Sequence, residues 1–355
     1  CDGDGVTNGT EVIDGTDPND PCVFVLTSAT VAQSAAWNVL DCDGDGVING
    51  TELTDGTDPQ DPCAFVLASA TIAPNAGWNT ADCDGDGVSN STEVIDGTNP
   101  LNNCDFLSGS ITLPVTAIAD CDGDGVSNTD EVADGTNPND PCDFVLASQS
   151  QAPSAAWNAL DCDGDGVTNG DEVIDGTDPL DDCSFLTASI TLVVTSTGDC
   201  DGDGVTNGDE ATDGTDPNDP CDFVLASATV APSAIWNAAD CDGDGVTNGD
   251  EVTDGTDPLD DCLFTAASIT LPITAIADCD GDGVSNTDEV TDGTDPNDPC
   301  AFVLANQSQA PSAAWNALDC DGDGVSNTDE VTDGTDPLDD CSFLTASITL
   351  VVTST

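Results

Sequence analysis

The sequence predicts a tandem-repeat fold: nine small modules with little helix, joined by short β-strand connectors in an elongated rod or filament. Three observations predict it. The phrase CDGDGVxN occurs nine times, at intervals of 41 or 38 residues, and a second cysteine follows each opening cysteine after 21 residues. The segments between these modules are almost uncharged, and the shorter ones alternate in side-chain character with the period of a strand. A fixed period of this length is the signature of a repeat architecture, in which each repeat is one unit of folding.

The composition excludes several classes of protein. The 355 residues include 71 Asp and Glu but no Lys, Arg or His, which gives a formal net charge of −71. Such self-repulsion opposes a compact state unless counter-charges come from outside the chain. Nucleic acid and anionic membranes are excluded as partners because contacts with phosphate need Lys or Arg, and no segment has the roughly 20 apolar residues of a membrane span. Histidine-based catalysis is excluded too, and no nucleophile–base arrangement remains, so we expect no enzyme.

Each repeat is predicted to have two parts. The first is an acidic module of 22 residues, such as Cys42 to Cys63, and the second is a connector that either is long and contains a Trp or is short and lacks one. We expect each Trp to pack against the next module rather than to stack on a sugar. The predicted repeats are 1–41, 42–82, 83–120, 121–161, 162–199, 200–240, 241–278, 279–319 and 320–355.

The short connectors predict β-strands. In the segment from Ser184, the residues Ile190, Leu192 and Val194 alternate with Thr191, Val193 and Thr195. A period of two with β-branched residues is typical of a strand. The long connectors are interrupted by Pro in most copies and predict two short extended pieces. We therefore expect β-pairing or packing of connectors between neighbouring repeats.

The start of each module has the residue types of a calcium-binding loop. In the second repeat, Asp41, Asp43 and Asp45 stand at positions 1, 3 and 5, Gly46 at position 6 and Glu52 at position 12, which fits D-x-[DN]-x-[DN]-G-x5-E. Calcium takes about six to eight hard oxygens, here from positions 1, 3 and 5, the carbonyl of position 7, position 9 either directly or through a water, and a bidentate carboxylate at position 12. All nine Glu of the chain stand at position 12, whereas every other acid is Asp.

We therefore predict at least one calcium ion per repeat, and magnesium is disfavoured because it prefers a tighter octahedron. The first loop lacks the Asp at position 1, since Cys1 stands at position 2. The predicted ligands are Asp2, Asp4, Val6, Asn8, Glu11, Asp41, Asp43, Asp45, Val47, Asn49, Glu52, Asp82, Asp84, Asp86, Val88, Asn90, Glu93, Asp120, Asp122, Asp124, Val126, Asn128, Glu131, Asp161, Asp163, Asp165, Val167, Asn169, Glu172, Asp199, Asp201, Asp203, Val205, Asn207, Glu210, Asp240, Asp242, Asp244, Val246, Asn248, Glu251, Asp278, Asp280, Asp282, Val284, Asn286, Glu289, Asp319, Asp321, Asp323, Val325, Asn327 and Glu330.

The whole module resembles a known family. After the loop comes Asp-Gly-Thr-Asp-Pro, where Gly and Pro would end a helix within about a turn. The pattern DxDGDGxxNxxE followed by GTDPxD is similar to the thrombospondin type 3 repeat of bacterial surface proteins, and the likeness covers the nine modules. The resemblance implies repeats that wrap around calcium with little regular secondary structure. It also implies Asp55, Asp58 and Asp61 as oxygens for the same or a second ion, for which turn formation is the alternative role.

The eighteen cysteines predict disulfides and an oxidising compartment, because zinc sites usually show C-x2-C or His partners. They can pair within a module or across a connector. The spacing within a module is constant, and a bridge of fixed geometry should lie where the length never varies. The favoured bridges are Cys1–Cys22, Cys42–Cys63, Cys83–Cys104, Cys121–Cys142, Cys162–Cys183, Cys200–Cys221, Cys241–Cys262, Cys279–Cys300 and Cys320–Cys341.

These predictions combine into an extracellular or cell-surface filament, stalk or adhesin rod, in which calcium neutralises the modules and disulfides lock them. Both ends of the sequence fall inside the periodic pattern, so we expect self-association or further repeats. A calcium-storing or matrix protein is one alternative. A dockerin-like binding module is another, but it needs a helix after each loop. Glycans are further candidate partners, with Asn306 as the one sequon outside the loops.

Overall fold

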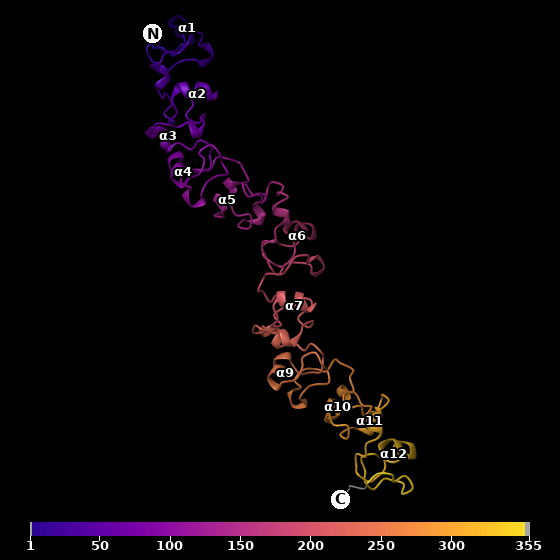
Figure 1. Cartoon of the computed structure of the whole chain (residues 1–355). Coiled ribbons are helices and arrows are strands. Elements are labelled where there is room, and N and C mark those ends of the chain that lie inside the picture. The colour runs from indigo at the N-terminus through magenta and orange to yellow at the C-terminus, as the bar shows by residue number, and fades with distance from the viewer. Residues whose placement is uncertain (1, 352–355) are drawn as a thin grey trace. The chain divides into compact units, whose positions relative to one another are not determined.

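The regular structure of the chain consists of short helices. The computed structural model describes residues 2–351, and Figure 1 labels its helices in chain order, with the exception of α8. Each repeat contributes one seven-residue α-helix, and three of the long connectors contribute a shorter one at their Trp. The seven-residue helices are α1 (Asn8–Asp14), α2 (Asn49–Asp55), α4 (Asn90–Asp96), α5 (Asn128–Asp134), α6 (Asn169–Asp175), α7 (Asn207–Asp213), α9 (Asn248–Asp254), α10 (Asn286–Asp292) and α12 (Asn327–Asp333). The shorter ones are α3 (Ala76–Thr80), α8 (Ala234–Asn237) and α11 (Ala313–Asn316).

The prediction of little helix is wrong, because the last four loop positions already form a helical turn. Helix α5 begins with a cap, in which the Ser127 side chain accepts a hydrogen bond from the Asp130 amide. It ends at Gly135, whose φ of 85° is left-handed and whose N–H donates to the carbonyl of Glu131. The glycine stop was therefore predicted correctly. Seven residues are too few for a visible hydrophobic period, so the helix depends on its two caps and on tertiary contacts.

The prediction of β-strand connectors is also wrong, since no strand occurs between residues 2 and 351. In the short connector chosen above, the amides of Thr191 and Leu192 both donate to the Gly166 carbonyl at 2.9 Å, and Thr195 donates to the Gly164 carbonyl at 2.8 Å. The extended segment is thus satisfied by two glycine carbonyls of its own loop rather than by a neighbouring strand. Ten 3-10 turns also lie in the connectors: η1 (Leu26–Ser28), η2 (Trp37–Val39), η3 (Leu67–Ser69), η4 (Ser108–Ser110), η5 (Leu146–Ser148), η6 (Trp157–Ala159), η7 (Thr187–Ser189), η8 (Leu225–Ser227), η9 (Ala266–Ser268) and η10 (Leu304–Asn306).

Each long connector closes a small hydrophobic core within its own repeat. In the sixth repeat, Val205, Phe223 and Trp236 form one buried cluster, with the two rings edge to face at 5.6 Å between centroids. The Trp236 indole N–H donates to the carbonyl of Pro220 at 2.8 Å. The Trp thus packs on its own module, and the expected packing against the next module also occurs, since Leu53 of α2 lies against the first repeat's cluster, which contains Trp37. The loop valine at position 7 and the connector are held together by this cluster.

The disulfides close the connectors and not the modules, so the predicted within-module pairing is wrong. Connectors of both lengths bring their two cysteines to Cα–Cα distances of 5.2–5.4 Å. The constant spacing inside a module reflects the loop and its helix instead of a bridge. Cys341 is a free, exposed cysteine, and Cys1 lies outside the described residues. The bridges are Cys22–Cys42, Cys63–Cys83, Cys104–Cys121, Cys142–Cys162, Cys183–Cys200, Cys221–Cys241, Cys262–Cys279 and Cys300–Cys320.

The chain divides into two units, each of which holds several repeats. The first unit runs to Cys162 and includes Thr168–Ile174, and the second comprises Asp163–Val167 and continues from Asp175. The loop of the fifth repeat therefore has residues in both units, whereas the other loops each lie within one. None of the helices in the described part of the chain has the length and apolarity that a membrane crossing requires.

Candidate metal centre

Carboxylates from one loop gather at each candidate site. In the second repeat, single oxygens of Asp41, Asp43 and Asp45 lie within 4.8 Å of one another. These are loop positions 1, 3 and 5, which the sequence predicted as ligands. In the first loop the same limit holds for positions 3, 5 and 12, which are Asp2, Asp4 and Glu11.

Backbone amides of the loop hold these carboxylates in place. Asp41 accepts hydrogen bonds at both oxygens, from the amides of Gly44 at 2.7 Å and Gly46 at 3.1 Å. Asp45 accepts with Oδ1 from the Val47 amide at 2.7 Å. The two glycines have φ values of 84° and 94°, which a side chain would resist. The loop backbone therefore positions one oxygen of Asp45 and leaves the other available to a ligand.

Eight of the position-12 carboxylates in the described part of the chain are buried without partners, and this is the decisive feature of the site. Glu52 has no exposed area, and neither of its oxygens accepts a hydrogen bond. The chain has no Lys, Arg or His, so no side chain could neutralise it. An uncompensated buried carboxylate costs several kcal/mol. Among the described residues, both oxygens lack a partner in Glu11, Glu52, Glu93, Glu131, Glu210, Glu251, Glu289 and Glu330.

The aspartates contribute further oxygens of the same kind. Asp43 accepts from the Asp45 amide with Oδ1 at 3.3 Å, whereas its Oδ2 is buried and accepts no hydrogen bond. Such an assembly of carboxylate oxygens without nitrogen or sulfur is the donor set that calcium prefers, so the residues present fit this ion. The buried Oδ2 atoms without a partner belong to Asp4, Asp43, Asp45, Asp84, Asp86, Asp122, Asp124, Asp201, Asp203, Asp242, Asp244, Asp280, Asp282, Asp321 and Asp323.

The electrostatics of the loop point the same way. Burial raises the pKa of Asp43 to about 7, with further repulsion from Asp45 and Asp41. Burial also raises the pKa of Glu52 to about 8, and Asp43 and Asp45 add to the effect. The pKa of Asp45 rises to about 6 for the same first reason, although its bond from Val47 opposes the shift. The protein alone therefore stabilises these negative charges poorly at neutral pH, and a bound cation would supply what is missing.

Positions 7 and 9 have additional structural roles. The side chain of Val47 is fully buried in a cluster with Phe65 and Trp78, which ties the loop to its connector. Its carbonyl as a metal ligand stays a prediction. Asn49 accepts from the Cys42 amide with Oδ1 at 3.1 Å and donates with Nδ2 to the Trp37 carbonyl at 3.3 Å. Because both ends of this carboxamide are bonded to the protein, the geometry speaks against position 9 as a ligand.

The tail of the module forms turns. Asp58 Oδ1 accepts from the Gln60 amide at 3.2 Å, and Asp61 Oδ1 accepts from the Cys63 amide at 3.1 Å. In the third repeat Asn99 accepts the equivalent bond from the Leu101 amide at 3.2 Å, which explains why Asn can replace Asp there. These contacts favour the turn role over ligation of a second ion.

One loop of the predicted ligand set does not lie within a single unit. The fifth loop, with Asp161, Asp163, Asp165, Val167, Asn169 and Glu172, has residues in both units and stays a prediction. Sequence reasoning also missed one contact of the tail, in which the Ser69 hydroxyl donates to Asp55 at 2.6 Å. The spacing of 14 residues between Asp and Ser, which eight of the nine repeats share, was the available signal.

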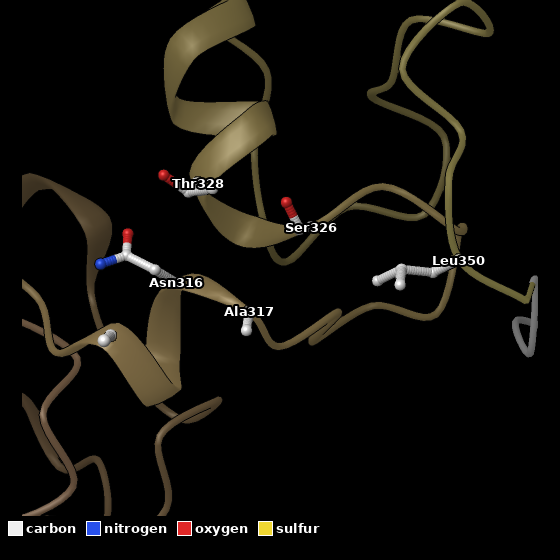
Figure 2. Close-up of a pocket in the computed structure, with 6 residues that line it drawn as sticks. Asn316, Ala317, Ser326, Thr328 and Leu350 are labelled. Atoms are coloured by element: carbon white, nitrogen blue, oxygen red, sulfur yellow. The ribbon is translucent and has the colours of Figure 1, made fainter.

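One surface hollow lies outside the carboxylate sites. It has a volume of about 550 Å³, and Figure 2 shows it between the end of α11, the start of α12 and the last connector. Thr328 stands at the loop position that Gly249 occupies in the seventh repeat. There the space is tight, because a Cβ atom on Gly249 would lie 2.9 Å from the Asn237 carbonyl oxygen. No charged side chain lines the hollow, so it adds nothing to the metal site. Its lining residues are Ala313, Asn316, Ala317, Ser326, Thr328 and Leu350.

Fold and site together define a tandem-repeat protein built from acidic metal-loop modules. The chain belongs to the bacterial TSP3 repeat family, a family of structural calcium-binding repeats, which confirms the resemblance seen in the sequence. No curated protein and no solved structure matches the chain. The family model covers more than half of the residues, in nine segments: 1–21, 41–62, 82–103, 120–141, 161–182, 199–220, 240–261, 278–299 and 319–340.

Proposed function

We propose that this chain is a calcium-stabilised structural array that forms part of an extracellular filament, stalk or adhesin rod. The observation that carries the proposal is the set of eight buried glutamates whose oxygens have no partner in a chain without cationic side chains. Calcium supplies the missing positive charge, with at least one ion per repeat. At a free concentration of about 1,000 times the dissociation constant, each ion adds roughly 4 kcal/mol to the stability of the folded state.

The disulfides support an extracellular location. Eight bridges in one chain are typical of an oxidising compartment and rare in the cytosol. Each bridge closes a connector of 20 or 17 residues, which contributes about 3 kcal/mol on the chain-entropy model. Repeats of about 40 residues need such additions because their own hydrophobic cores are small.

The test is to count and remove the metal. Native mass spectrometry of the oxidised chain should show at least one calcium per repeat, and calcium but not magnesium should raise the thermal midpoint seen by Trp fluorescence. Electron microscopy with and without EDTA should show an extended particle that softens or collapses on chelation. An unchanged midpoint and shape in excess EDTA would contradict the proposal.

The two alternatives predict other outcomes. A calcium store needs many weak exposed sites, and would titrate without a folding transition, whereas the glutamates here are fully buried. The helix at the end of each loop supports the alternative of a dockerin-like binding module, which needs such a helix. The exposed residues of those helices differ between repeats, however: α1 presents Val12 and Ile13, whereas α7 has Ala211 and Thr212 at the same positions. No single recognition surface is therefore repeated, which favours the structural function.

A further inference from the structure

The Asn side chain at loop position 9 joins three groups that belong to different parts of the fold. In the seventh repeat, Asn248 Oδ1 accepts from the Cys241 amide at 3.0 Å. Its Nδ2 donates to the Trp236 carbonyl at 3.1 Å and to Cys241 Sγ at 3.3 Å. The side chain has no exposed area. One carboxamide thus contacts the loop, the disulfide and the connector of the preceding repeat.

The arrangement is constant although the connectors differ. In the second to ninth repeats the Oδ1 atom accepts from the amide of the opening cysteine at 3.0–3.1 Å, and Nδ2 lies 2.9–3.3 Å from the sulfur of the same cysteine. After a long connector the third partner is a Trp carbonyl. After a short connector, Asn128 and Asn207 donate instead to the carbonyl before the second cysteine, as in the bond from Asn207 to Asp182 at 3.2 Å. The Asn residues are Asn49, Asn90, Asn128, Asn169, Asn207, Asn248, Asn286 and Asn327.

We propose that this Asn is a positioning residue that couples each calcium site to the disulfide-closed connector before it. The inference rests on the proposed function, because it assigns a path by which calcium orders the neighbouring repeat. Cys241 stands between the predicted ligands Asp240 and Asp242, and its bridge to Cys221 closes the preceding connector. Metal binding fixes the loop on both sides of this cysteine.

The second branch of the path runs through helix α9. This helix begins at Asn248 and carries Glu251 in its first turn. The Asn248 amide also donates to the Ala239 carbonyl at 2.8 Å, so both backbone and side chain of the first helical residue hold the end of the connector. When Glu251 binds the metal, it therefore fixes the position of helix α9. The contacts of Asn248 then fix the Cys221–Cys241 bridge and Trp236 relative to that helix.

A ligand role and a positioning role make opposite predictions for Asn248→Asp. As a ligand, Asp would add a negative charge to the site and keep or strengthen calcium binding. As a positioning residue, Asp lacks the two N–H donors and would face the Trp236 carbonyl and Cys241 sulfur with an acceptor. The buried amide contacts would be lost, and calcium would no longer protect the Cys221–Cys241 bridge.

The experiment measures the reduction of individual bridges in the full-length chain. Free thiols are first alkylated, and the protein is then exposed to a low concentration of dithiothreitol in calcium or in EDTA. Newly formed thiols are trapped with a second alkylating reagent and assigned by peptide mass spectrometry. The ratio of the reduction rates in EDTA and in calcium gives the protection of each bridge in the same molecule.

In the wild type we expect calcium to protect Cys221–Cys241 by about tenfold or more, which is roughly 1.4 kcal/mol. Asn248→Asp and Asn248→Ala should both abolish this protection while the other bridges keep theirs, which also shows that the chain stays folded. Asn218→Asp is the matched control, since it adds the same charge three residues before Cys221 at an exposed position, and should leave the protection unchanged.

Undiminished protection of Cys221–Cys241 in Asn248→Asp or in Asn248→Ala would overturn the coupling role. Equal loss in Asn218→Asp would also overturn it, because charge near the bridge would then explain the effect. If calcium protects no bridge even in the wild type, the proposed calcium-stabilised function itself fails. The two failures are therefore distinguishable.

Discussion

Replacing Glu251 by Gln should have opposite effects on the seventh repeat in calcium and in EDTA. Glu251 is fully buried, and neither of its oxygens has a protein partner. In calcium, the Gln variant loses one charge and one of the two oxygens. Removing one member of a buried charge pair costs about 3–5 kcal/mol, which corresponds to a loss of roughly 100-fold to several thousand-fold in affinity at this site.

In EDTA the same substitution removes a carboxyl group whose ionised form nothing compensates. Burial and the neighbouring Asp242 and Asp244 raise the pKa of Glu251 to about 8. At neutral pH the folded loop must therefore keep this carboxyl group protonated or hold an uncompensated charge, and either costs free energy. A neutral carboxamide relieves that penalty. The variant should therefore be at least as stable as the wild type without calcium and less stable with it.

Native mass spectrometry at a fixed free calcium concentration should show one ion fewer in Glu251→Gln, and hydrogen exchange should locate the change at α9. The matched control is Asp260→Asn, which removes one charge from the same module. Asn102 stands at the corresponding position and accepts the equivalent bond from Cys104, so this change should be neutral. Our reasoning would be refuted by a full calcium count in the variant, or by lower stability than the wild type in EDTA.

Three further predictions concern pH, packing and the loop backbone. In EDTA the free energy of unfolding should fall as pH rises from about 4.5 to about 8, because the raised pKa values of groups such as Glu52 mean that the folded state binds more protons than the unfolded state. In calcium it should stay nearly constant over most of this window, because bound calcium keeps these carboxyl groups ionised in the folded state and the unfolded state binds almost no protons there; equal slopes in urea titrations would contradict this. Trp236→Ala should lower the free energy of unfolding in urea by about 3–5 kcal/mol, because the side chain is fully buried. Trp236→Phe should lower it less, because it loses mainly the 2.8 Å hydrogen bond to Pro220. Equal losses would be inconsistent with the packing. Gly245→Ala should weaken calcium binding strongly, because the new Cβ would lie 2.9 Å from the Leu271 carbonyl oxygen at a residue whose φ is 93°. In the control Gly255→Ala the Cβ meets no atom within 4 Å, so this change should cost only about 1 kcal/mol of stability. Similar calcium affinities of the two variants in calorimetry would count against this difference.

The sequence was sufficient for the features that local chemistry determines. The positions of Asp41, Asp43 and Asp45 follow from a fixed ligand spacing, and the structure gathers them as predicted. The end of each seven-residue helix follows from a glycine that adopts a left-handed φ. Both depend only on residues close together in the chain.

The features that were predicted wrongly depend on contacts between segments. The alternation of Ile190 and Thr191 predicted a strand, but the partner of this segment is a pair of glycine carbonyls, which no periodicity reveals. The constant cysteine spacing predicted a bridge within the module. In the structure the loop and its helix keep this length constant instead. The ligand role of Asn49 stays a prediction from its position in the loop, and the sequence did not show that its side chain contacts Cys42 and Trp37.

The location of the bridges determines how the chain would respond to a pulling force. Tension entering at Cys42 passes through the loop and helix to Cys63 and then crosses the sulfur bond to Cys83, so the intervening connector bears no load. Only the 21-residue segments between bridges can unravel, and each could release up to about 70 Å of extended length. The mechanical strength of the array is thus assigned to its acidic loops, and under the proposed function calcium concentration would set the force at which it yields.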